Sequence, residues 1–153
     1  MSAPIKVNTD ATPVIIYGRL DRMARGVAEH MAPEYDVVHA CTAYAAAIHE
    51  IPNLLSGDVD IRPSNNIGSN ASRDAGANVI PKIVCCGGGI PQEEVGALKD
   101  AIKNHPKDGS WKDEVKWLLV PREEVVAAMG ESGVPTPEVS AGISRRLLKE
   151  MGV

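Results

Sequence analysis

Three consecutive glycines, Gly87, Gly88 and Gly89, form the segment of this sequence best suited to binding a ligand. They follow an apolar run, residues 81–86, and precede Pro91, a residue typical of the first turn of a helix. A glycine turn between a strand and a helix lets the backbone approach a ligand closely and directs N–H groups at an anion. A tight turn with positive φ would need the same glycines without any ligand, so both interpretations stay open.

Cys86, His39 and Asn66 are the residues that we consider for catalysis. Cys86 directly precedes the glycine turn, where the start of a helix would stabilise a thiolate. His39 ends a second apolar run, residues 35–39, and has the chemistry of a general base. Neither spacing guarantees that the two side chains meet, and a buried cysteine more often serves as a small apolar residue.

Residues 57–80 differ from the rest of the chain because they are rich in Gly, Ser, Asn and Asp. An irregular stretch of this length is uncommon inside a compact domain and is often functional. Asn65 and Asn66 could hydrogen-bond an oxygenated ligand, and we interpret the stretch as a polar insertion that acts as a lid. An exposed insertion without a function is the alternative.

The fold follows from four strand patterns that alternate with helix patterns. Apolar, β-branched runs predict strands, and apolar residues at helical spacing follow them. This alternation predicts an α/β, three-layer Rossmann- or flavodoxin-like fold with a parallel sheet of four or five strands and helices on both faces. We expect one domain over residues 1–153. The predicted strands cover residues 13–17, 35–39, 81–86 and 115–120.

In such sheets the ligand binds outside the carboxyl ends of the strands, where the strand order reverses. This rule selects four segments, residues 18–22, 39–42, 86–89 and 121–124. The predicted substrate-binding residues lie in or beside these segments or in the polar insertion: Tyr17, Arg19, Thr42, Asn65, Gly87, Gly88 and Gly89.

The sequence predicts neither a cofactor nor a metal. A dinucleotide site needs G-x-G-x-x-G after the first strand, but bulky residues separate Gly18 from Gly26. The second strand should end near an acidic residue for the ribose, and here it continues into residues 39–42, which contain none. A zinc site needs more Cys and His residues at ligand spacing, and a phosphoacceptor domain would have an Asp in place of Cys86.

Composition narrows the classes of partner. The net charge of −4 and the small number of aromatic residues (two Trp, three Tyr, no Phe) argue against nucleic acid. No apolar run approaches the ~20 residues of a membrane-spanning helix. The cysteines, Cys41, Cys85 and Cys86, are odd in number and two are adjacent, so we expect reduced thiols and a cytoplasmic location.

Two segments resemble the cobalamin-binding domains in order and spacing. Residues 21–26, DRMARG, resemble their D-x-H-x-x-G motif, with Met23 at the position of the axial histidine. Residues 87–95, GGGIPQEEV, resemble their glycine-rich turn before a helix. This resemblance implies a degenerate cobalamin-binding domain.

A second resemblance covers most of the chain. Residues 14–18 (VIIYG), 34–39 (EYDVVH) and 86–89 (CGGG) are similar to small stand-alone Rossmann-like proteins of filamentous fungi. It implies the fold and a place in small-molecule metabolism, and some proteins of this kind are cofactor-free tailoring enzymes.

These features lead to three hypotheses. The first is a small-molecule-binding domain that acts as a cofactor-independent enzyme of the cyclase, isomerase or lyase type. The second is a non-enzymatic regulatory or scaffolding module, a homodimer whose interface would include Leu147 on the predicted helix over residues 138–151. The third is a degenerate NAD(P)- or cobalamin-binding domain.

Overall fold

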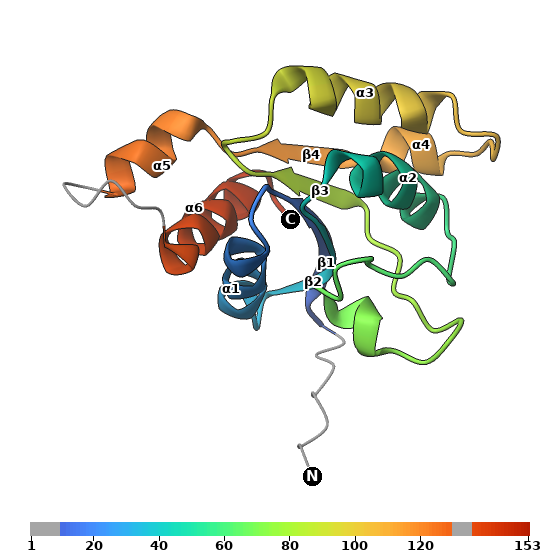
Figure 1. Cartoon of the computed structure of the whole chain (residues 1–153), viewed down its shortest axis with the longest axis horizontal. Coiled ribbons are helices and arrows are strands. Elements are labelled where there is room, and N and C mark those ends of the chain that lie inside the picture. Colours follow the sequence, from blue (N-terminus) through green and yellow to red (C-terminus); the bar gives the residue numbers. More distant parts are fainter. Residues whose placement is uncertain (1–9, 130–135) are drawn as a thin grey trace, which may run out of the picture.

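A computed structural model describes residues 10–129 and 136–153 of the chain, so residues 1–9 and 130–135 of the predicted domain lie outside the described part. The described residues form a four-stranded sheet in the order β2-β1-β3-β4, and all neighbouring strands are parallel (Figure 1). This arrangement confirms the predicted α/β fold. The strands are β1 (Thr12–Tyr17), β2 (Tyr35–Cys41), β3 (Ile83–Cys86) and β4 (Lys116–Leu119).

Helices cover both faces of the sheet, as a three-layer fold requires (Figure 1). One face packs against α1 (Asp21–Met31) and α6 (Pro137–Glu150), and the other against α2 (Tyr44–Leu55) and α3 (Gln92–Lys103). None of the helices in the described ranges is both long and apolar enough to cross a membrane. The remaining elements are the 3₁₀ turn η1 (Ser69–Ser72), α4 (Trp111–Glu114) and α5 (Arg122–Met129).

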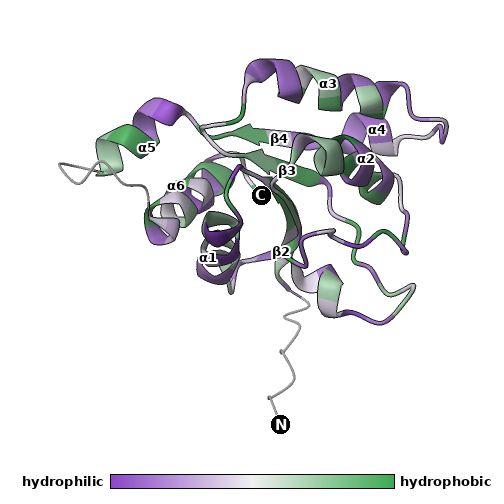
Figure 2. Cartoon of the chain, viewed as in Figure 1, coloured by the Kyte–Doolittle hydropathy of each residue, from purple (hydrophilic) through white to green (hydrophobic). Residues whose placement is uncertain are grey.

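Side-chain alternation along the strands builds a separate apolar core on each face. In β1, Val14 and Ile16 point toward α1 and α6, whereas Ile15 and Tyr17 point toward α2 and α3. In Figure 2 most of the sheet is therefore coloured hydrophobic, while hydrophilic and hydrophobic segments alternate along the helices. Burying an Ile or Val side chain stabilises a fold by about 1.5–3 kcal/mol, so these alternating residues hold the layers together.

An irregularity in β2 changes the face to which its last residues point. The register runs from Val14↔Val37 to Ile15↔His39, which leaves Val38 as an extra residue. After this bulge, Ala40 faces α1 and α6, and Cys41 faces α2 and α3. Bulges often reorient side chains beside functional sites; here the bulge brings His39 to the α2 side.

The strand order reverses between β1 and β3. The chain passes from β1 through α1 to β2 on one side, and from β3 through α3 to β4 on the other. The turns that follow β1 and β3 are hydrogen-bonded to the neighbouring strands. The amide of Gly18 donates to the Cys41 carbonyl (3.0 Å), and the amide of Gly87 donates to the Tyr17 carbonyl (2.9 Å). A ligand crevice is expected at this position.

The polar segment, residues 57–80, packs along the free edge of β2. The amide of Ala40 donates to the carbonyl of Ile67 at 2.9 Å, and Ile67 is buried in the core. Asn70 is fully buried, and its side-chain amide pairs with both the N–H and the carbonyl of Val79. These contacts hold the segment in the fold and cover part of an edge that would otherwise be exposed.

Candidate functional site

A cavity of about 490 Å³ opens where the strand order reverses, at the carboxyl ends of β1 and β3. Its walls come from α1, α5 and α6, and Ile16 and Cys85 of the sheet contribute to its floor. Small-molecule sites usually measure about 300–1,000 Å³, so this cavity has the size of one.

The interior of the cavity is mainly apolar. Met23 and Val27 of α1 face Val125 and Val126 of α5 across it. Two hydroxyls interrupt this surface on α6, those of Ser140 and Ser144, and neither makes a hydrogen bond to another residue in the described part of the chain. An apolar ligand with few polar groups would fit this lining.

The mouth of the cavity carries two arginines, one of them paired with Glu94, and free backbone donors. Arg19 follows β1, and Arg122 begins α5 beyond β4. In the described structure, the amides of Gly88 and Gly89 donate no hydrogen bond to the protein. A mouth of this kind suits a carboxylate or a developing oxyanion.

Tight packing, not an unusual φ angle, explains the middle glycine of the turn. A Cβ at Gly88 would lie 3.1 Å from the Arg122 Cα and 3.4 Å from the Val120 carbonyl oxygen. None of the three glycines has a positive φ. The turn after β3 therefore packs directly on the connection from β4 to α5, which fixes the position of its amides relative to the backbone of Arg122.

The turn after β1 is less suited to a dinucleotide. A Cβ at Gly18 would meet no atom within 4 Å, so this glycine is not required for close packing. Arg19 and the exposed Leu20 follow it, where the dinucleotide motif has a second glycine. Met23, at the position of the axial histidine in the cobalamin-binding motif, lines the apolar wall of the cavity.

Arg19 is held at the mouth by Tyr17 and Glu94. The Tyr17 hydroxyl donates to Glu94 at 2.5 Å, while Arg19 donates to the Tyr17 oxygen at 3.2 Å and also binds Glu94. Burial, followed by the hydrogen bond to Glu94, raises the pKa of Tyr17 well above its usual range. Tyr17 is therefore a neutral phenol that positions the arginine.

The two adjacent cysteines divide between the faces of the sheet. Cys86, chosen from the sequence, lines the cavity at its edge but packs with the α2 and α3 core, whereas Cys85 lies on the cavity side. Sequence reasoning missed Cys85, although strict alternation from Ile83 places it with the other residues of that face. Burial raises the pKa of both thiols to about 12, so neither is a thiolate near neutral pH.

Thr42, Asn65 and Asn66 lie at the end of β2 and do not line the cavity in the described structure. Thr42 donates to Asp21 at 2.5 Å and accepts from the Asn65 side chain at 3.4 Å, which joins the polar segment to α1. Asn66 is exposed, has φ 61°, and closes a turn through its N–H to the Pro63 carbonyl. Asparagine tolerates this left-handed conformation better than most residues.

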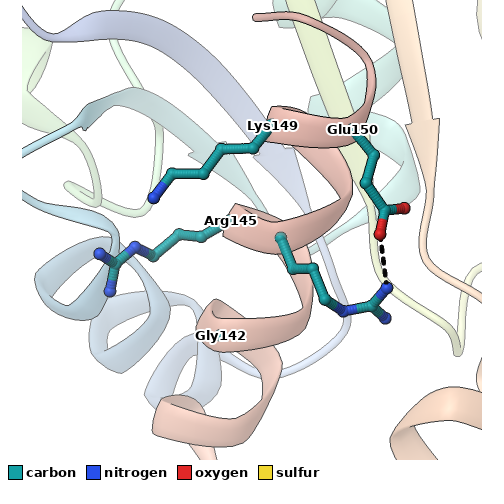
Figure 3. Close-up of a pocket in the computed structure, with 5 residues that line it drawn as sticks. Gly142, Arg145, Lys149 and Glu150 are labelled. Atoms are coloured by element: carbon teal, nitrogen blue, oxygen red, sulfur yellow. Dashed lines mark hydrogen bonds and ion pairs between the residues drawn. The ribbon is translucent and has the colours of Figure 1, made fainter.

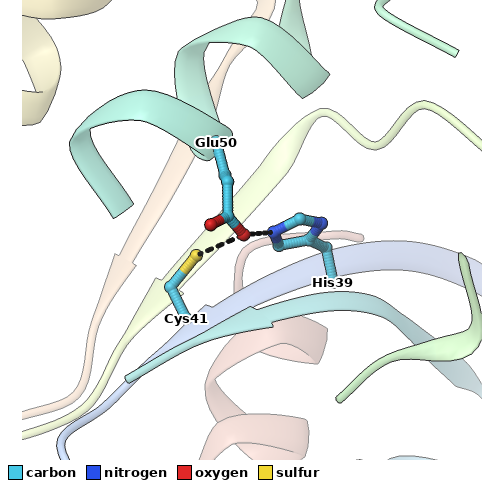
Figure 4. A group of neighbouring side chains, drawn as sticks. All are labelled: His39, Cys41 and Glu50. Carbon is cyan, nitrogen blue, oxygen red and sulfur yellow. Dashed lines mark hydrogen bonds and ion pairs between the residues drawn. The ribbon is translucent and has the colours of Figure 1, made fainter. Parts of the chain in front are cut away.

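His39 is buried on the opposite side of the sheet from the cavity wall, among residues that contact α2 (Figure 4). Its Nε2 lies 2.8 Å from the Glu50 Oε1. The sequence search missed Glu50, although it is three residues after Ala47 and four before Leu54 and therefore lies on the buried face of α2. A carboxylate on such a face needs a partner inside the protein.

Sequence analysis predicted only some of the other residues that line the cavity. Arg122 falls within the strand-end segment predicted at residues 121–124. Ser140 and Ser144, four residues apart, share one helical face, but the sequence does not show that this face meets α1 and α5 across a cavity.

A second hollow, of about 540 Å³, lies on the outside of α6 (Figure 3). The charged side chains of this hollow already pair with carboxylates. Arg145 donates to Glu34 at 2.7 Å and Arg146 donates to Glu150 at 3.0 Å, while the Lys149 ammonium lies 3.5 Å from Glu34. The buried stripe of the same helix packs within the chain, where Ala141 and Leu148 are fully buried and Leu147 is partly buried. The homodimer remains a prediction. The hollow is lined by Gly142, Arg145, Arg146, Lys149 and Glu150.

Comparison with known proteins identifies a distant relative. No protein-family model and no solved structure matches this chain. Kojic acid related protein 6 of Aspergillus oryzae is 29% identical over 135 residues, which cover 88% of this chain and 72% of that protein. The chain is thus similar to a fungal protein and has a parallel sheet consistent with a Rossmann-like fold, and no family is established.

Proposed function

We propose that this domain binds a small, mainly apolar molecule with an anionic oxygen at one end and converts it without a bound cofactor, in an isomerase, cyclase or lyase reaction. The observation that carries the proposal is the cavity at the strand ends, with its apolar interior and its cationic mouth. The apolar body of the ligand would lie against α1 and α5. Its oxygen would face Arg19, Arg122 and the free amides of the glycine turn.

The chemistry that this mouth favours is stabilisation of an enolate or a related oxyanion. Fixed donors aimed at a developing negative charge lower the barrier of such reactions, and they act more strongly where water is excluded. Arg19 is fixed by its bonds to Tyr17 and Glu94. Packing against Gly88 fixes the backbone of Arg122, whose side chain is exposed. Arg19 is therefore suited to hold an oxyanion in place, and Arg122 would supply a second cation beside it.

The roles predicted from the sequence shift accordingly. Of the three catalytic candidates, Cys86 lines the cavity, whereas His39 and Asn66 do not. We assign binding of the oxyanion to Arg19, Arg122, Gly88 and Gly89.

The relative from Aspergillus oryzae supports a role in small-molecule metabolism. Its name associates that protein with kojic acid, and we propose a biosynthetic role of the same general kind here. We also propose a cytoplasmic location, because the three cysteines are unpaired and buried.

A thermal-shift screen with matched ligand pairs tests the proposal. Small aromatic and branched aliphatic carboxylates are compared with their primary amides, together with NAD, NADP, FMN and cobalamin. Arg122→Met removes a cation from the mouth and Ser144→Leu fills the interior, while Arg22→Met, outside the cavity lining, is the matched control. Ligand binding to the native state raises the melting temperature.

We expect saturable stabilisation by carboxylates but not by their amides, and we expect it to be lost in the two cavity variants and kept in the control. Liquid chromatography coupled to mass spectrometry of the bound molecule then separates the functions. A product of equal mass but different retention time indicates an isomerase or cyclase, a loss of mass indicates a lyase, and an unchanged mass and retention time indicate a binding module. Stabilisation by a nucleotide or cobalamin, or equal effects in all variants, would contradict the proposal.

A further inference from the structure

A second group of reactive side chains lies on the other face of the sheet, between β2 and α2. His39 and Cys41 come from β2, and Glu50 comes from α2; we call these three residues the β2–α2 cluster (Figure 4). All three are buried, with exposed fractions of 0%, 1% and 5%. No residue of the cluster lines the strand-end cavity.

The cluster is slightly wider than a formed metal site. Its three ligand atoms, one nitrogen, one sulfur and one oxygen, lie within 4.8 Å of one another. Ligands at 2.0–2.3 Å from a tetrahedral zinc ion lie roughly 3.3–3.8 Å apart. The Glu50 Oε1 lies 2.8 Å from the His39 Nε2 and 4.0 Å from the Cys41 Sγ, so small side-chain movements would let all three ligands reach a common ion.

The buried carboxylate of Glu50 has no Lys or Arg partner in the described residues. Its Oε1 accepts hydrogen bonds from the His39 Nε2 at 2.8 Å and from the Ser64 amide at 3.2 Å. Buried charges in proteins either pair with an opposite charge or coordinate a metal, so this carboxylate is suited to a bound cation.

We propose that His39, Cys41 and Glu50 bind one zinc-class transition-metal ion through Nε2, Sγ and Oε1. Sulfur and imidazole ligands favour such ions over magnesium or calcium. On binding, the Cys41 thiol releases its proton to solvent, and the His39 proton moves from Nε2 to Nδ1. The ion's charge of +2 is then balanced by one thiolate and one carboxylate, so the site becomes neutral.

The ion would join three parts of the fold. β2 is an edge strand, α2 covers it, and the polar segment reaches the same carboxylate through the amide of Ser64 at 3.2 Å. Metal bound here would hold the bulge of β2 against α2 and stabilise the folded state. This role is independent of the function proposed for the strand-end cavity, so either proposal can fail alone.

Cobalt substitution tests the proposal because Co²⁺ bound to a thiolate has a sulfur-to-metal charge-transfer band. The purified full chain is stripped with a chelator and titrated with Co²⁺. The double variant Cys85→Ala/Cys86→Ala leaves Cys41 as the only thiol in the sequence. We expect one Co²⁺ per chain and a charge-transfer band in both proteins, loss of the band in Cys41→Ser, and displacement by Zn²⁺. Loss of the band in the double variant, or its persistence in Cys41→Ser, would overturn the proposal.

The unaltered protein provides a test that does not depend on the folding of any variant. Its zinc content is measured after expression in zinc-supplemented medium, and its melting temperature before and after chelation. We expect one zinc per chain, a lower melting temperature after chelation and recovery on adding Zn²⁺. A folded protein without zinc, with a melting temperature insensitive to Zn²⁺, would show that the cluster is only a hydrogen-bonded group.

Discussion

Replacing Gly68 with alanine should destabilise the domain far more than an ordinary substitution in a polar segment. Gly68 has φ 123°, and a Cβ there would lie 2.5 Å from the Val38 carbonyl oxygen and 2.7 Å from the backbone nitrogen and Cα of His39. These atoms belong to the bulged part of β2. Because they are backbone atoms, they cannot rotate away as the end of a side chain could.

Two costs add up at this position. A residue other than glycine in such a backbone conformation costs on the order of 1–3 kcal/mol, and overpacking typically costs about 1–3 kcal/mol more. The free energy of unfolding should therefore fall by roughly 2–6 kcal/mol, a large part of the ~5–15 kcal/mol typical of a domain. Since the displaced backbone includes His39, metal binding by the β2–α2 cluster should weaken as well.

Urea unfolding followed by circular dichroism measures the change. Gly96→Ala in α3 is the matched control, because a Cβ there meets no atom within 4 Å. This control should be stabilised by about 0.5–1 kcal/mol, the advantage of alanine over glycine in a helix. A Gly68→Ala variant as stable as the unaltered protein would show that the polar segment does not press on the β2 bulge, and the reasoning would be refuted.

Three further substitutions test other contacts. The hydrogen bond from Arg145 lowers the pKa of Glu34, so its contribution to stability is present above the unfolded carboxyl pKa and is lost as pH falls through the lower folded value; in urea unfolding from neutral to acidic pH, Glu34→Gln should weaken this pH dependence. Tyr17→Phe removes the hydrogen bond to Glu94 and should lower the free energy of unfolding by about 1–3 kcal/mol in urea titrations. Met31→Ala opens space at a fully buried position and should cost about 2–5 kcal/mol, whereas a melting temperature unchanged by it would contradict the core assignment.

The sequence was most informative about elements that depend on local patterns. The apolar run predicted at residues 35–39 became β2 (Tyr35–Cys41), and the run at 13–17 became β1 (Thr12–Tyr17). Runs of β-branched residues predict strands and Pro91 predicts the start of a helix, and both patterns can be recognised from a few neighbouring positions. Arg19 and the glycine turn, which the rule about strand ends selects, both line the cavity.

Long-range packing decided what the sequence did not reveal. Val38 is an extra residue because of the way in which β2 pairs with β1. Unless this pairing is known, the face of the sheet to which His39 points cannot be assigned. The pairing of His39 with Glu50 joins residues of β2 and α2, and no local pattern specifies it. The position of the polar segment depends on a bond from Ala40 to Ile67 across the sheet edge.

Nuclear magnetic resonance on the labelled protein tests ligand binding at the strand ends most directly. The carboxylate that gives the largest thermal shift is titrated while the amides of Gly88 and Gly89 and the methyl groups of Val125 and Val126 are followed. These groups border the cavity from its mouth and its α5 wall. We expect saturable shifts at all four residues with a single dissociation constant. The absence of such shifts, or their confinement to the outer hollow of α6 around Lys149, would contradict a ligand site at the ends of β1 and β3.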